Sequence, residues 1–430
     1  MLKLISKNAL ARNTAWMSVG QGLRLAIRAA YFIVIIRSLG VSNYGAFVGV
    51  VALVGILSPF GALGSGALLI KNVSRDKRLF ASTWGMALIT LAVSSSLLIG
   101  VVLPISRFAL PAVIPLRLVL LIAVSDILGL NLIGVAGQAF QAFEQLEWTA
   151  TINVLISAGR LAGGILLVLI QRHPSALQWG YVYCGTTLAV AITAYRLVTT
   201  KLGPPVLSFV RSLAEIREGF YFSVSLSAQT IYNDIDKTML ARLSTLSATG
   251  IYGAAYRLID VSFAPVSALL AAAYPNFFRR GVAGVSSTLA YARQLLKHAL
   301  GYSSLICAGI LLCAGAVPYI LGPEYARTAE ALRWLAPLPI LKALHYFLSD
   351  TLTGAGYQGL RSALQTMVAL FNVLINLWLI PAYSWRGAAW SSIASDGLLA
   401  CAVGIAVFIL TSRESRQVEL AGMAPKVTTG

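Results

Sequence analysis

Charged side chains recur inside long apolar stretches of this 430-residue chain, where a charge needs a specific role. The segment QTIYNDIDKTML, residues 229–240, carries Asp234, Asp236 and Lys237 almost side by side. The other charges of this kind are Arg24, Arg28, Arg37, Asp126, Arg160, Arg257, Asp260, Arg333, Lys342, Asp350 and Asp396. Arginines bind phosphate through paired N–H donors, and carboxylates can carry a proton or Na⁺. These residue types therefore indicate the handling of an anionic group or of an ion.

The composition identifies the surroundings of these charges as a membrane. Hydrophobic residues make up 58% of the chain and charged residues only 11%, and the mean hydropathy is +0.79. Soluble domains have about 45–50% apolar and about 25% charged residues. The four cysteines, Cys184, Cys307, Cys313 and Cys401, fall in apolar runs without metal-ligand spacing, so we interpret them as buried thiols. The chain is therefore predicted to be an integral membrane protein with no metal site.

Windows of about 20 residues predict twelve membrane-spanning helices. The predicted spans are 14–38, 44–70, 81–106, 113–140, 147–171, 177–199, 217–243, 247–278, 290–321, 328–354, 358–381 and 386–411. The segment 200–216 begins with Gly203-Pro204-Pro205 and is predicted to be a cytoplasmic linker with a short surface helix. We expect an N-terminal lobe (1–199), this linker, a C-terminal lobe (217–411) and a cytoplasmic tail (412–430).

Lysine and arginine residues gather in the connections on one side of these spans. With the N-terminus inside, the cytoplasmic segments hold Lys71, Arg75, Lys77, Arg78, Arg279, Arg280, Arg293, Lys297 and others, whereas the outer connections hold only Arg107, Arg117, Arg172, Arg242, Arg327 and Arg386. This positive-inside bias predicts that both termini are cytoplasmic. It also explains most of the net charge of +18, so anionic lipids rather than nucleic acid are the expected partners of the basic loops.

The two halves of the chain resemble each other at a spacing of about 210 residues. NVLI occurs at 153–156 and 372–375, and NYGAF (43–47) is echoed by IYGAA (251–255). Pro59 and Pro265 follow these YG segments at similar distances. Because six spans are an even number, both copies would face the same way across the membrane, as a parallel repeat. Proline bends helices, so Pro59 and Pro265 are predicted to be hinges; the alternative is that they are kinks that aid packing.

The intramembrane charges are predicted to face a polar cavity. A lipid-facing charge at the bilayer centre costs at least about 2.5–3.5 kcal/mol. Helical spacing places Gln21, Arg24, Arg28 and Tyr31 on one stripe, and Gln229, Asn233, Asp236 and Lys237 on another. Two other interpretations stay open: Arg257 and Asp260 form a structural pair, and Asp234, Asp236 and Lys237 compensate one another.

Three arginines of the N-terminal half have no acidic residue near them in the sequence. They are Arg24, Arg28 and Arg160, and Asp126 is the one carboxylate of that half inside a span. An uncompensated cationic set in a polar cavity would bind an anion. We therefore expect these arginines, with Arg257 and Lys237, to form the substrate site, and Asp234, Asp236 and Asp260 to be candidates for ion coupling.

Several motifs resemble those of a known family. They are RSLGVSNYGAF (37–47), YGAAYRL (252–258), LGPEYARTAEALRWLAPLP (321–339), GAGYQGLRS (354–362) and NVLINLWLIPAYSWRGAAWSS (372–392). They are similar to polysaccharide transporters of the multidrug/oligosaccharidyl-lipid/polysaccharide (MOP) exporter superfamily, and most similar to Wzx-type O-antigen flippases. The resemblance runs over nearly the whole chain.

This resemblance implies a V-shaped bundle of two six-helix lobes that works by alternating access. It implies translocation of an undecaprenyl-diphosphate-linked oligosaccharide from the cytoplasmic to the periplasmic leaflet of the bacterial inner membrane. Its partners would be that glycan, membrane lipids, and the polymerase and other membrane proteins of polysaccharide assembly. The cavity arginines of such flippases match Arg24, Arg28, Arg160 and Arg257 by helix placement. No cofactor is expected, apart from a coupling ion, Na⁺ or H⁺.

Other function classes stay open. A drug/cation antiporter of the same fold would need cavity carboxylates, and those present mostly lie beside Lys or Arg. A lipid II flippase would share the fold. A membrane enzyme such as a glycan polymerase or ligase would need a substantial outer loop with acid/base groups. The predicted outer loops are short, and His173, His298 and His345 form no paired motif. The chain has no Walker A motif, so ATP is not expected to drive it directly.

Overall fold

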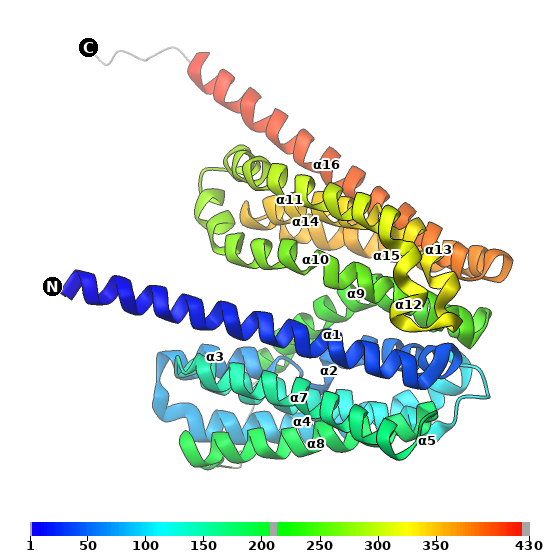
Figure 1. The fold of residues 1–430 in the computed structure, drawn as a ribbon. Helices are drawn as coiled ribbons and strands as arrows, with labels where there is room; N and C mark the ends of the chain where they lie inside the picture. Colours follow the sequence, from blue (N-terminus) through cyan, green and yellow to red (C-terminus); the bar gives the residue numbers. More distant parts are fainter. Residues whose placement is uncertain (1, 207–212, 424–430) are drawn as a thin grey trace, which may run out of the picture. The chain divides into compact units, whose positions relative to one another are not determined.

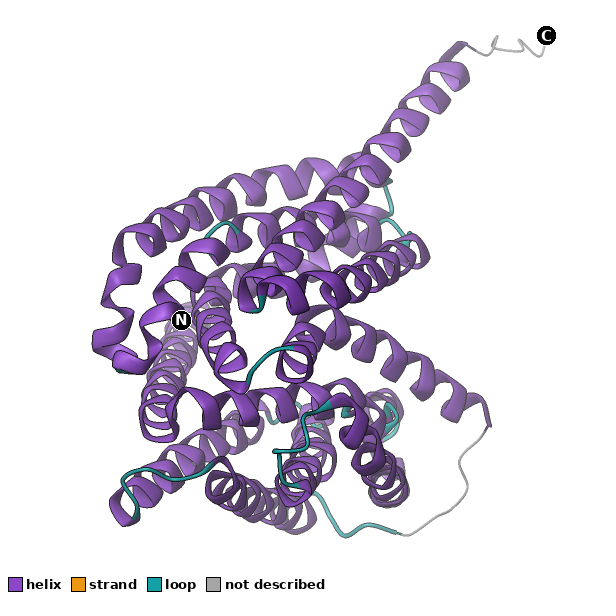
Figure 2. Cartoon of the chain, turned by 90° about the vertical axis from the view of Figure 1, so that its right-hand side faces the viewer, coloured by secondary structure: helices purple, strands orange, loops and turns teal. Residues whose placement is uncertain are grey.

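The computed structural model describes residues 2–206 and 213–423; residues 1, 207–212 and 424–430 lie outside the description. For residues 2–26, 146 and 417–423, and for several residues between 213 and 229, the backbone alone is described. Within these ranges every regular element is helical (Figure 2). The predicted all-α membrane fold is confirmed.

The described residues form two compact units, Met1–Ser227 and Ala228–Gly430. The elements of the first unit are α1 (Leu2–Leu57), α2 (Pro59–Ala62), α3 (Ser65–Arg75), η1 (Lys77–Leu79), α4 (Phe80–Ala109), α5 (Leu116–Ala123), η2 (Val124–Leu130), α6 (Asn131–Ala142), α7 (Leu146–Ile170) and α8 (Ala176–Lys201) (Figure 1). The boundary between the units lies inside α9 (Leu213–Leu243). The predicted lobes and the linker 200–216 stay a prediction.

The second unit continues from α9 with helices that pack against one another around α14. They are α10 (Leu246–Gly281), α11 (Val285–Cys313), η3 (Ala314–Ala316), α12 (Val317–Leu321), η4 (Pro323–Tyr325), α13 (Ala326–Leu335), α14 (Leu338–Gly354), α15 (Gln358–Tyr383) and α16 (Trp385–Met423). α14 contacts α10, α11, α15 and α16. Its side chains are therefore at the centre of this unit.

Most residues of each predicted span are helical. The first two predicted spans are joined in α1, whose backbone breaks at Gly40 with φ 70° and ψ 169°. In the described part of the chain, nine stretches are long and apolar enough to cross a membrane, and one of them, Ile27–Arg75, contains the second of those predicted spans and the end of the first. α9 and α14 are not among the nine; α14 has only 17 residues. The exact number of twelve crossings stays a prediction that agrees with these helices.

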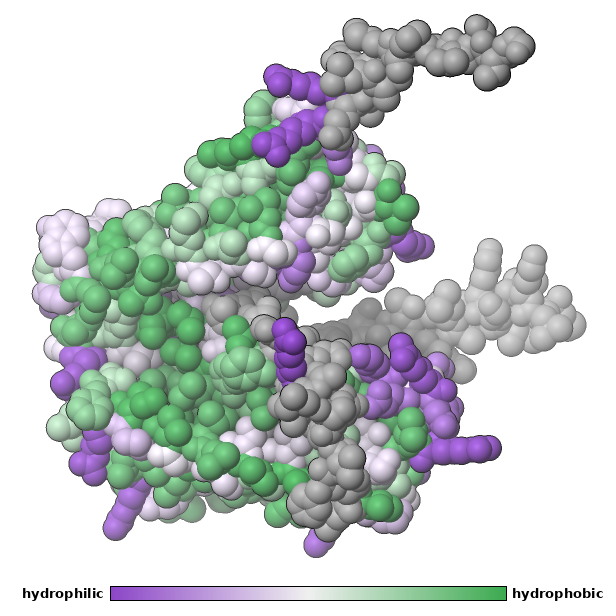
Figure 3. Space-filling model, turned by 180° about the vertical axis from the view of Figure 1, so that it is seen from behind, coloured by the Kyte–Doolittle hydropathy of each residue, from purple (hydrophilic) through white to green (hydrophobic). Residues whose placement is uncertain are grey.

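The helices expose apolar stripes, as lipid-facing helices do. On α4, the residues exposed at intervals of three or four are Val93, Leu97, Val101, Ile105 and Phe108. On α15, Met367, Leu370, Leu374 and Leu377 are exposed in the same way, whereas Asn372 and Asn376 are buried. Figure 3 shows hydrophobic side chains over much of the visible surface, with hydrophilic ones in separate patches mostly near its outline. Apolar side chains outside and polar side chains inside are the arrangement expected of helices that face lipid.

Each unit has its own apolar core. In the first unit Leu69, Trp84, Phe140 and Val198 pack together from α3, α4, α6 and α8. In the second unit one cluster around Phe277 and Phe347 joins α10, α11 and α14. A second cluster includes Val285, Leu352, Val368 and Val403. The cysteines are free, and the expectation that all four are buried holds only for Cys184: Cys307 is partly exposed, and Cys313 and Cys401 are exposed.

Candidate functional site

In the first unit, Arg160 of α7 is held by α8 and by the π-helical segment η2. Its guanidinium lies 3.9 Å from the ring centroid of Tyr183, and its Nη2 donates to Thr187 Oγ1 at 3.1 Å. Nη2 is 3.9 Å from Asp126 Oδ1, which also accepts a hydrogen bond of 3.0 Å from the Tyr183 hydroxyl. Asp126, Tyr183 and Thr187 are buried. Three helical elements thus build one buried cation–carboxylate cluster.

Asp126 lies in the π-helical turn η2. Polar side chains donate hydrogen bonds to backbone carbonyl groups in and beside this turn. Asn131 Nδ2 donates to the carbonyls of Ser58 and Ile127, each at 2.9 Å. Ser95 Oγ donates to the Ile127 carbonyl and Ser58 Oγ to the Asp126 carbonyl, each at 3.0 Å. Carbonyls inside a membrane require such partners. Sequence reasoning missed this turn, although Ser58, Ser95 and Asn131 inside apolar runs were the available signal.

The expectation that Arg160 lacks an anionic partner is wrong, because Asp126 supplies one from another element. Arg28, in α1, has an exposed side chain. The side chain of Arg24 lies outside the described residues, so its predicted role stays a prediction. The structure therefore separates the predicted N-terminal cation set: Arg160 is compensated, and Arg28 lies at the surface of the unit.

In the second unit two lysines flank one aromatic ring. The Nζ atoms of Lys237 and Lys342 lie 4.1 and 4.5 Å from the ring centroid of Tyr256. Lys237 pairs with Asp234 and donates to the Asn233 carbonyl at 3.0 Å. Lys342 Nζ is 3.3 Å from Asp260 Oδ1. This arrangement joins α9, α10 and α14 through two ion pairs and the face of a buried tyrosine.

Two further carboxylates of this unit are buried behind these pairs. Asp236 accepts hydrogen bonds from the hydroxyls of Tyr252 and Ser392, the latter at 3.2 Å. Asp396 accepts from the Tyr232 hydroxyl, and its Oδ1 lies 3.1 Å from His345 Nε2. Sequence reasoning did not identify these tyrosine partners, because apolar spans commonly carry tyrosine for packing alone.

The predicted pair between Arg257 and Asp260 does not form. Within the described residues no ion pair joins them, and Asp260 pairs with Lys342 instead. The Arg257 side chain is exposed on α10. The alternative that Lys237 and its acidic neighbours compensate one another is supported for Asp234, whereas Asp236 is satisfied mainly by hydroxyl groups and the Lys237 backbone N–H.

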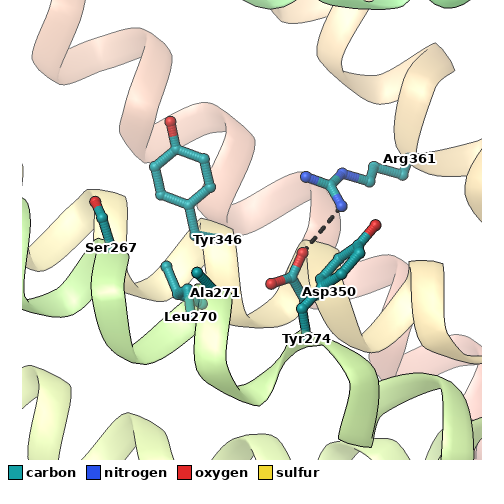
Figure 4. Close-up of a pocket in the computed structure, with 7 residues that line it drawn as sticks. All are labelled: Ser267, Leu270, Ala271, Tyr274, Tyr346, Asp350 and Arg361. Carbon is teal, nitrogen blue, oxygen red and sulfur yellow. Dashed lines mark hydrogen bonds and ion pairs between the residues drawn. The ribbon is translucent and has the colours of Figure 1, made fainter. Parts of the chain in front are cut away.

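Two cavities of about 300 Å³ each lie on this polar face of the second unit. Their shared wall consists of Ser267 and Tyr346. The first is lined by Asn233, Asp234, Tyr256, Asp260, Phe263, Ser267, Lys342 and Tyr346. The second is lined by Ser267, Leu270, Ala271, Tyr274, Tyr346, Asp350 and Arg361, and Figure 4 shows the ion pair between the last two, at 3.0 Å. They form an adjoining polar space along α10 and α14.

The donor set of these cavities suits hydrogen bonding rather than metal binding. In the described part of the chain, no group of three or more His, Cys, Asp or Glu residues could hold a metal ion. Asp234, Asp260 and Asp350 each face a lysine or arginine. The cavities thus offer oxygen acceptors, hydroxyls and aromatic faces in a nearly charge-balanced setting.

The two predicted hinge residues occupy different local structures. Pro59 begins α2 directly after the end of α1, and the following Leu63 and Gly64 both have positive φ, 42° and 66°. Pro265 lies inside the uninterrupted helix α10. Whether either segment moves stays a prediction. The backbone leaves helical geometry at Leu63 and Gly64, directly after α2.

Solved structures of membrane proteins share this fold. An inward-facing multidrug resistance MATE family transporter of the MOP superfamily is 14% identical, with a TM-score of 0.73, 93% of this chain covered and 96% of that chain. The lipid II flippase MurJ in an inward closed conformation is 10% identical, also with a TM-score of 0.73, covering 91% of this chain and 87% of that chain. These similarities show that the chain has the fold of these multi-pass membrane proteins.

Sequence relatives place it more narrowly. Residues 10–280 match the model of the polysaccharide biosynthesis protein family, and the chain belongs to that family. It is 22% identical over 414 residues to the "Putative O-antigen transporter" of Escherichia coli (strain K12), covering 92% of this chain and 95% of that protein. It is 22% identical over 246 residues to the "Probable low-salt glycan biosynthesis flippase Agl15" of Haloferax volcanii, covering 56% of this chain and 51% of that protein.

Proposed function

We propose that this chain is a flippase for undecaprenyl-diphosphate-linked oligosaccharide repeat units. It moves them by alternating access from the cytoplasmic to the periplasmic leaflet of a bacterial inner membrane, for O-antigen or another surface polysaccharide. The observation that carries the proposal is the family match over residues 10–280, joined to full-length similarity with a protein named as an O-antigen transporter. Lipid II flipping and drug export by the same fold are the alternatives.

The polar groups inside the helices support a hydrophilic head group as cargo. Exposed carboxylates on membrane helices require water or a polar ligand, because lipid would not solvate them. Cavities lined by Asp234, Asp260 and Asn233 supply such an environment on the second unit. A diphosphate would bind to guanidinium groups, and the candidates are the exposed Arg28 and Arg257 together with Arg24, whose predicted role is untested.

The compensated carboxylates argue against a cationic drug. A cation site gains its affinity from carboxylates without a positive partner, whereas Lys237 and Lys342 already pair with Asp234 and Asp260. In the first unit Arg160 likewise accompanies Asp126. This charge balance favours a glycolipid over a cation.

Reconstitution tests the proposed function. The purified chain is placed in vesicles with an undecaprenyl-diphosphate-linked oligosaccharide in both leaflets, and a membrane-impermeant glycosidase is added outside. We expect complete cleavage with the protein and about half cleavage without it. Cleavage that stays at half, together with uptake of a cationic dye, would support the antiporter instead. Complete cleavage of lipid II, with cleavage of the oligosaccharide lipid that stays at half, would support the lipid II alternative.

A further inference from the structure

In the adjoining cavities of the second unit, the carboxylates are more exposed than the lysines with which they pair. Asp234 and Asp260 have side chains 39% and 43% exposed, whereas their partners Lys237 and Lys342 are only 10% and 5% exposed. The buried Tyr256 ring lies between the two ammonium groups. A ligand in the cavity therefore meets carboxylate oxygens first, and the lysines lie behind them.

The walls add aromatic faces and neutral polar groups. Tyr256, Phe263 and Tyr346 line the first cavity with Asn233, and Tyr274 and Tyr346 line the second with Ser267. Figure 4 shows Tyr274 and Asp350 beside Arg361 in the second cavity. Sugar rings have apolar C–H faces that stack on aromatic rings, and hydroxyl groups that donate to carboxylates in charge-assisted hydrogen bonds. This combination of groups fits a carbohydrate.

The same order of depth disfavours charged ligands. An anionic sugar would approach two exposed carboxylates and find the lysine charges already paired behind them. A metal or drug cation would find carboxylates that are already neutralised. Hydroxyl and amide donors gain from these oxygens without a competing charge. The cavities therefore suit neutral sugars, including N-acetylated ones.

We propose that these two cavities bind the glycan of the transported lipid and select repeat units that lack acidic sugars. The inference rests on the proposed flippase function, and it assigns to Asp234 and Asp260 the role of hydroxyl acceptors. Lys237 and Lys342 act as positioning residues: they hold the two carboxylates and do not contact phosphate. Ser267 and Tyr346 connect the subsites of successive sugars.

Binding by the full chain in lipid nanodiscs tests this inference. The probes are undecaprenyl diphosphate, the same lipid with a neutral disaccharide of N-acetylglucosamine and glucose, and the same lipid with glucuronic acid in place of glucose. We expect the neutral glycolipid to bind about tenfold more tightly than either other lipid, because each charge-assisted hydrogen bond is worth about that factor. Equal affinities for the neutral and acidic glycolipids overturn the inference and leave the flippase function intact.

Matched variants locate the binding to these cavities. Ser267 is exposed on α10, so Ser267→Trp should fill the shared wall without straining the core. The neighbouring Ala268 is also exposed but does not line either cavity, so Ala268→Trp is the control. We expect Ser267→Trp to lower affinity for the neutral glycolipid to that of undecaprenyl diphosphate, and Ala268→Trp to leave it unchanged. Unchanged affinity in Ser267→Trp overturns the inference.

The charge argument has its own variant. Asp260→Asn/Lys342→Met removes a whole ion pair, so that no buried lysine is left without its carboxylate. We expect this variant to lose the tenfold preference for the neutral over the glucuronate-bearing lipid, while undecaprenyl diphosphate still binds. A retained preference overturns the role of Asp260. Absence of binding by all three lipids to the wild-type chain overturns the flippase function itself.

Discussion

Arg160 and Asp126 show how single residues in the first unit are held in place. Asp126 is buried and the Arg160 side chain is only 17% exposed, with its guanidinium also against Tyr183. Removing one member of a buried pair leaves an uncompensated charge and costs about 3–5 kcal/mol, whereas removing both is far less harmful. We expect Asp126→Ala to lower the free energy of unfolding by about that amount, and Arg160→Met/Asp126→Leu to restore most of it.

Thermal unfolding in detergent checks this expectation. The control is Glu330→Ala, which breaks an ion pair to Arg386 whose side chains are 42% and 52% exposed, and which should cost less than about 1 kcal/mol. Similar midpoint shifts for Asp126→Ala and Glu330→Ala would show that the Arg160 pair contributes no more than a surface contact.

The arginines of α1 provide a functional prediction at the same scale. Arg24→Ala/Arg28→Ala should abolish glycolipid flipping while membrane insertion stays normal, because the diphosphate loses its planar N–H donors. Lysine at both positions should restore flipping only in part. Arg172→Ala, at an exposed residue between α7 and α8, is the control. Wild-type flipping by the α1 double variant would remove both arginines from the substrate site.

Single-residue partners were the least predictable feature of the site. The charged residues inside apolar runs stood out in the sequence, and the described clusters contain Arg160, Lys237, Asp234, Asp236 and Asp260. Their partners did not follow, because pairing depends on which helix faces which. Asp260 pairs with Lys342, 82 residues away, rather than with Arg257 one helical turn away. Tyr183, Tyr252 and Tyr256 gave no signal that distinguishes a hydrogen-bonding tyrosine from a packing one.

At the scale of elements, η2 depends on side chains that complete its hydrogen bonds. Asn131 serves the carbonyls of both Ser58 and Ile127. A leucine side chain is nearly equal in size to that of Asn131, but Asn131→Leu would leave these carbonyl acceptors without that donor. We therefore expect a loss of about 1–3 kcal/mol in unfolding free energy. Thermal unfolding measures it. Asn153→Leu on α7 is the comparison, and an equal shift in both variants would contradict a special role for η2.

We expect the segment between α1 and α3 to move during transport. At Gly64 (φ 66°), a Cβ would lie 2.7 Å from the Cα of Gly219, so this turn requires glycine. Pro59→Ala leaves the turn sterically possible and adds a backbone donor that favours straight helix. We expect Pro59→Ala to slow reconstituted transport more than it lowers folding yield, and Pro265→Ala to have a smaller effect.

A comparison of Pro59→Ala with Pro265→Ala shows whether the prolines act as hinges or only aid helix packing. Transport rate and the yield of folded protein are measured for both prolines under the same conditions. Unchanged rates in both variants would mean that the prolines only shape the packing of α2 and α10.

The helical segments themselves were predictable over the whole molecule, because a stretch of about 20 consecutive apolar residues indicates a membrane-spanning helix. The prediction placed spans 147–171 and 358–381 within a residue or two of α7 and α15. The exceptions have physical causes. A helix break such as Gly40 needs one residue with positive φ, which glycine permits but does not require. The π-helical turn needs tertiary partners that no local pattern announces.

The energy source is a property of the whole molecule and follows from charge and orientation. With a negative cytoplasm, a diphosphate head group with about two negative charges moves outward down the membrane potential. Each charge gains about 2.3 kcal/mol per 100 mV, so two gain about 4–5 kcal/mol. This gain corresponds to a bias of about a thousandfold or more in the distribution of the lipid. We therefore expect the potential alone to drive transport, provided that the binding site returns empty.

Vesicles with a K⁺ diffusion potential, and without a Na⁺ or pH gradient, measure this directly. We expect the rate and final extent of outward flipping to rise with an inside-negative potential and to fall when the potential is reversed. The alternative is coupling to Na⁺ or H⁺ through Asp234, Asp236 or Asp260. Asp234 and Asp260 already pair with lysines, whereas Asp236 is held mainly by the hydroxyls of Tyr252 and Ser392 and is the better candidate. Transport that ignores the potential but follows an imposed Na⁺ or H⁺ gradient, and that is lost in Asp236→Asn, would replace potential-driven transport by ion coupling at Asp236.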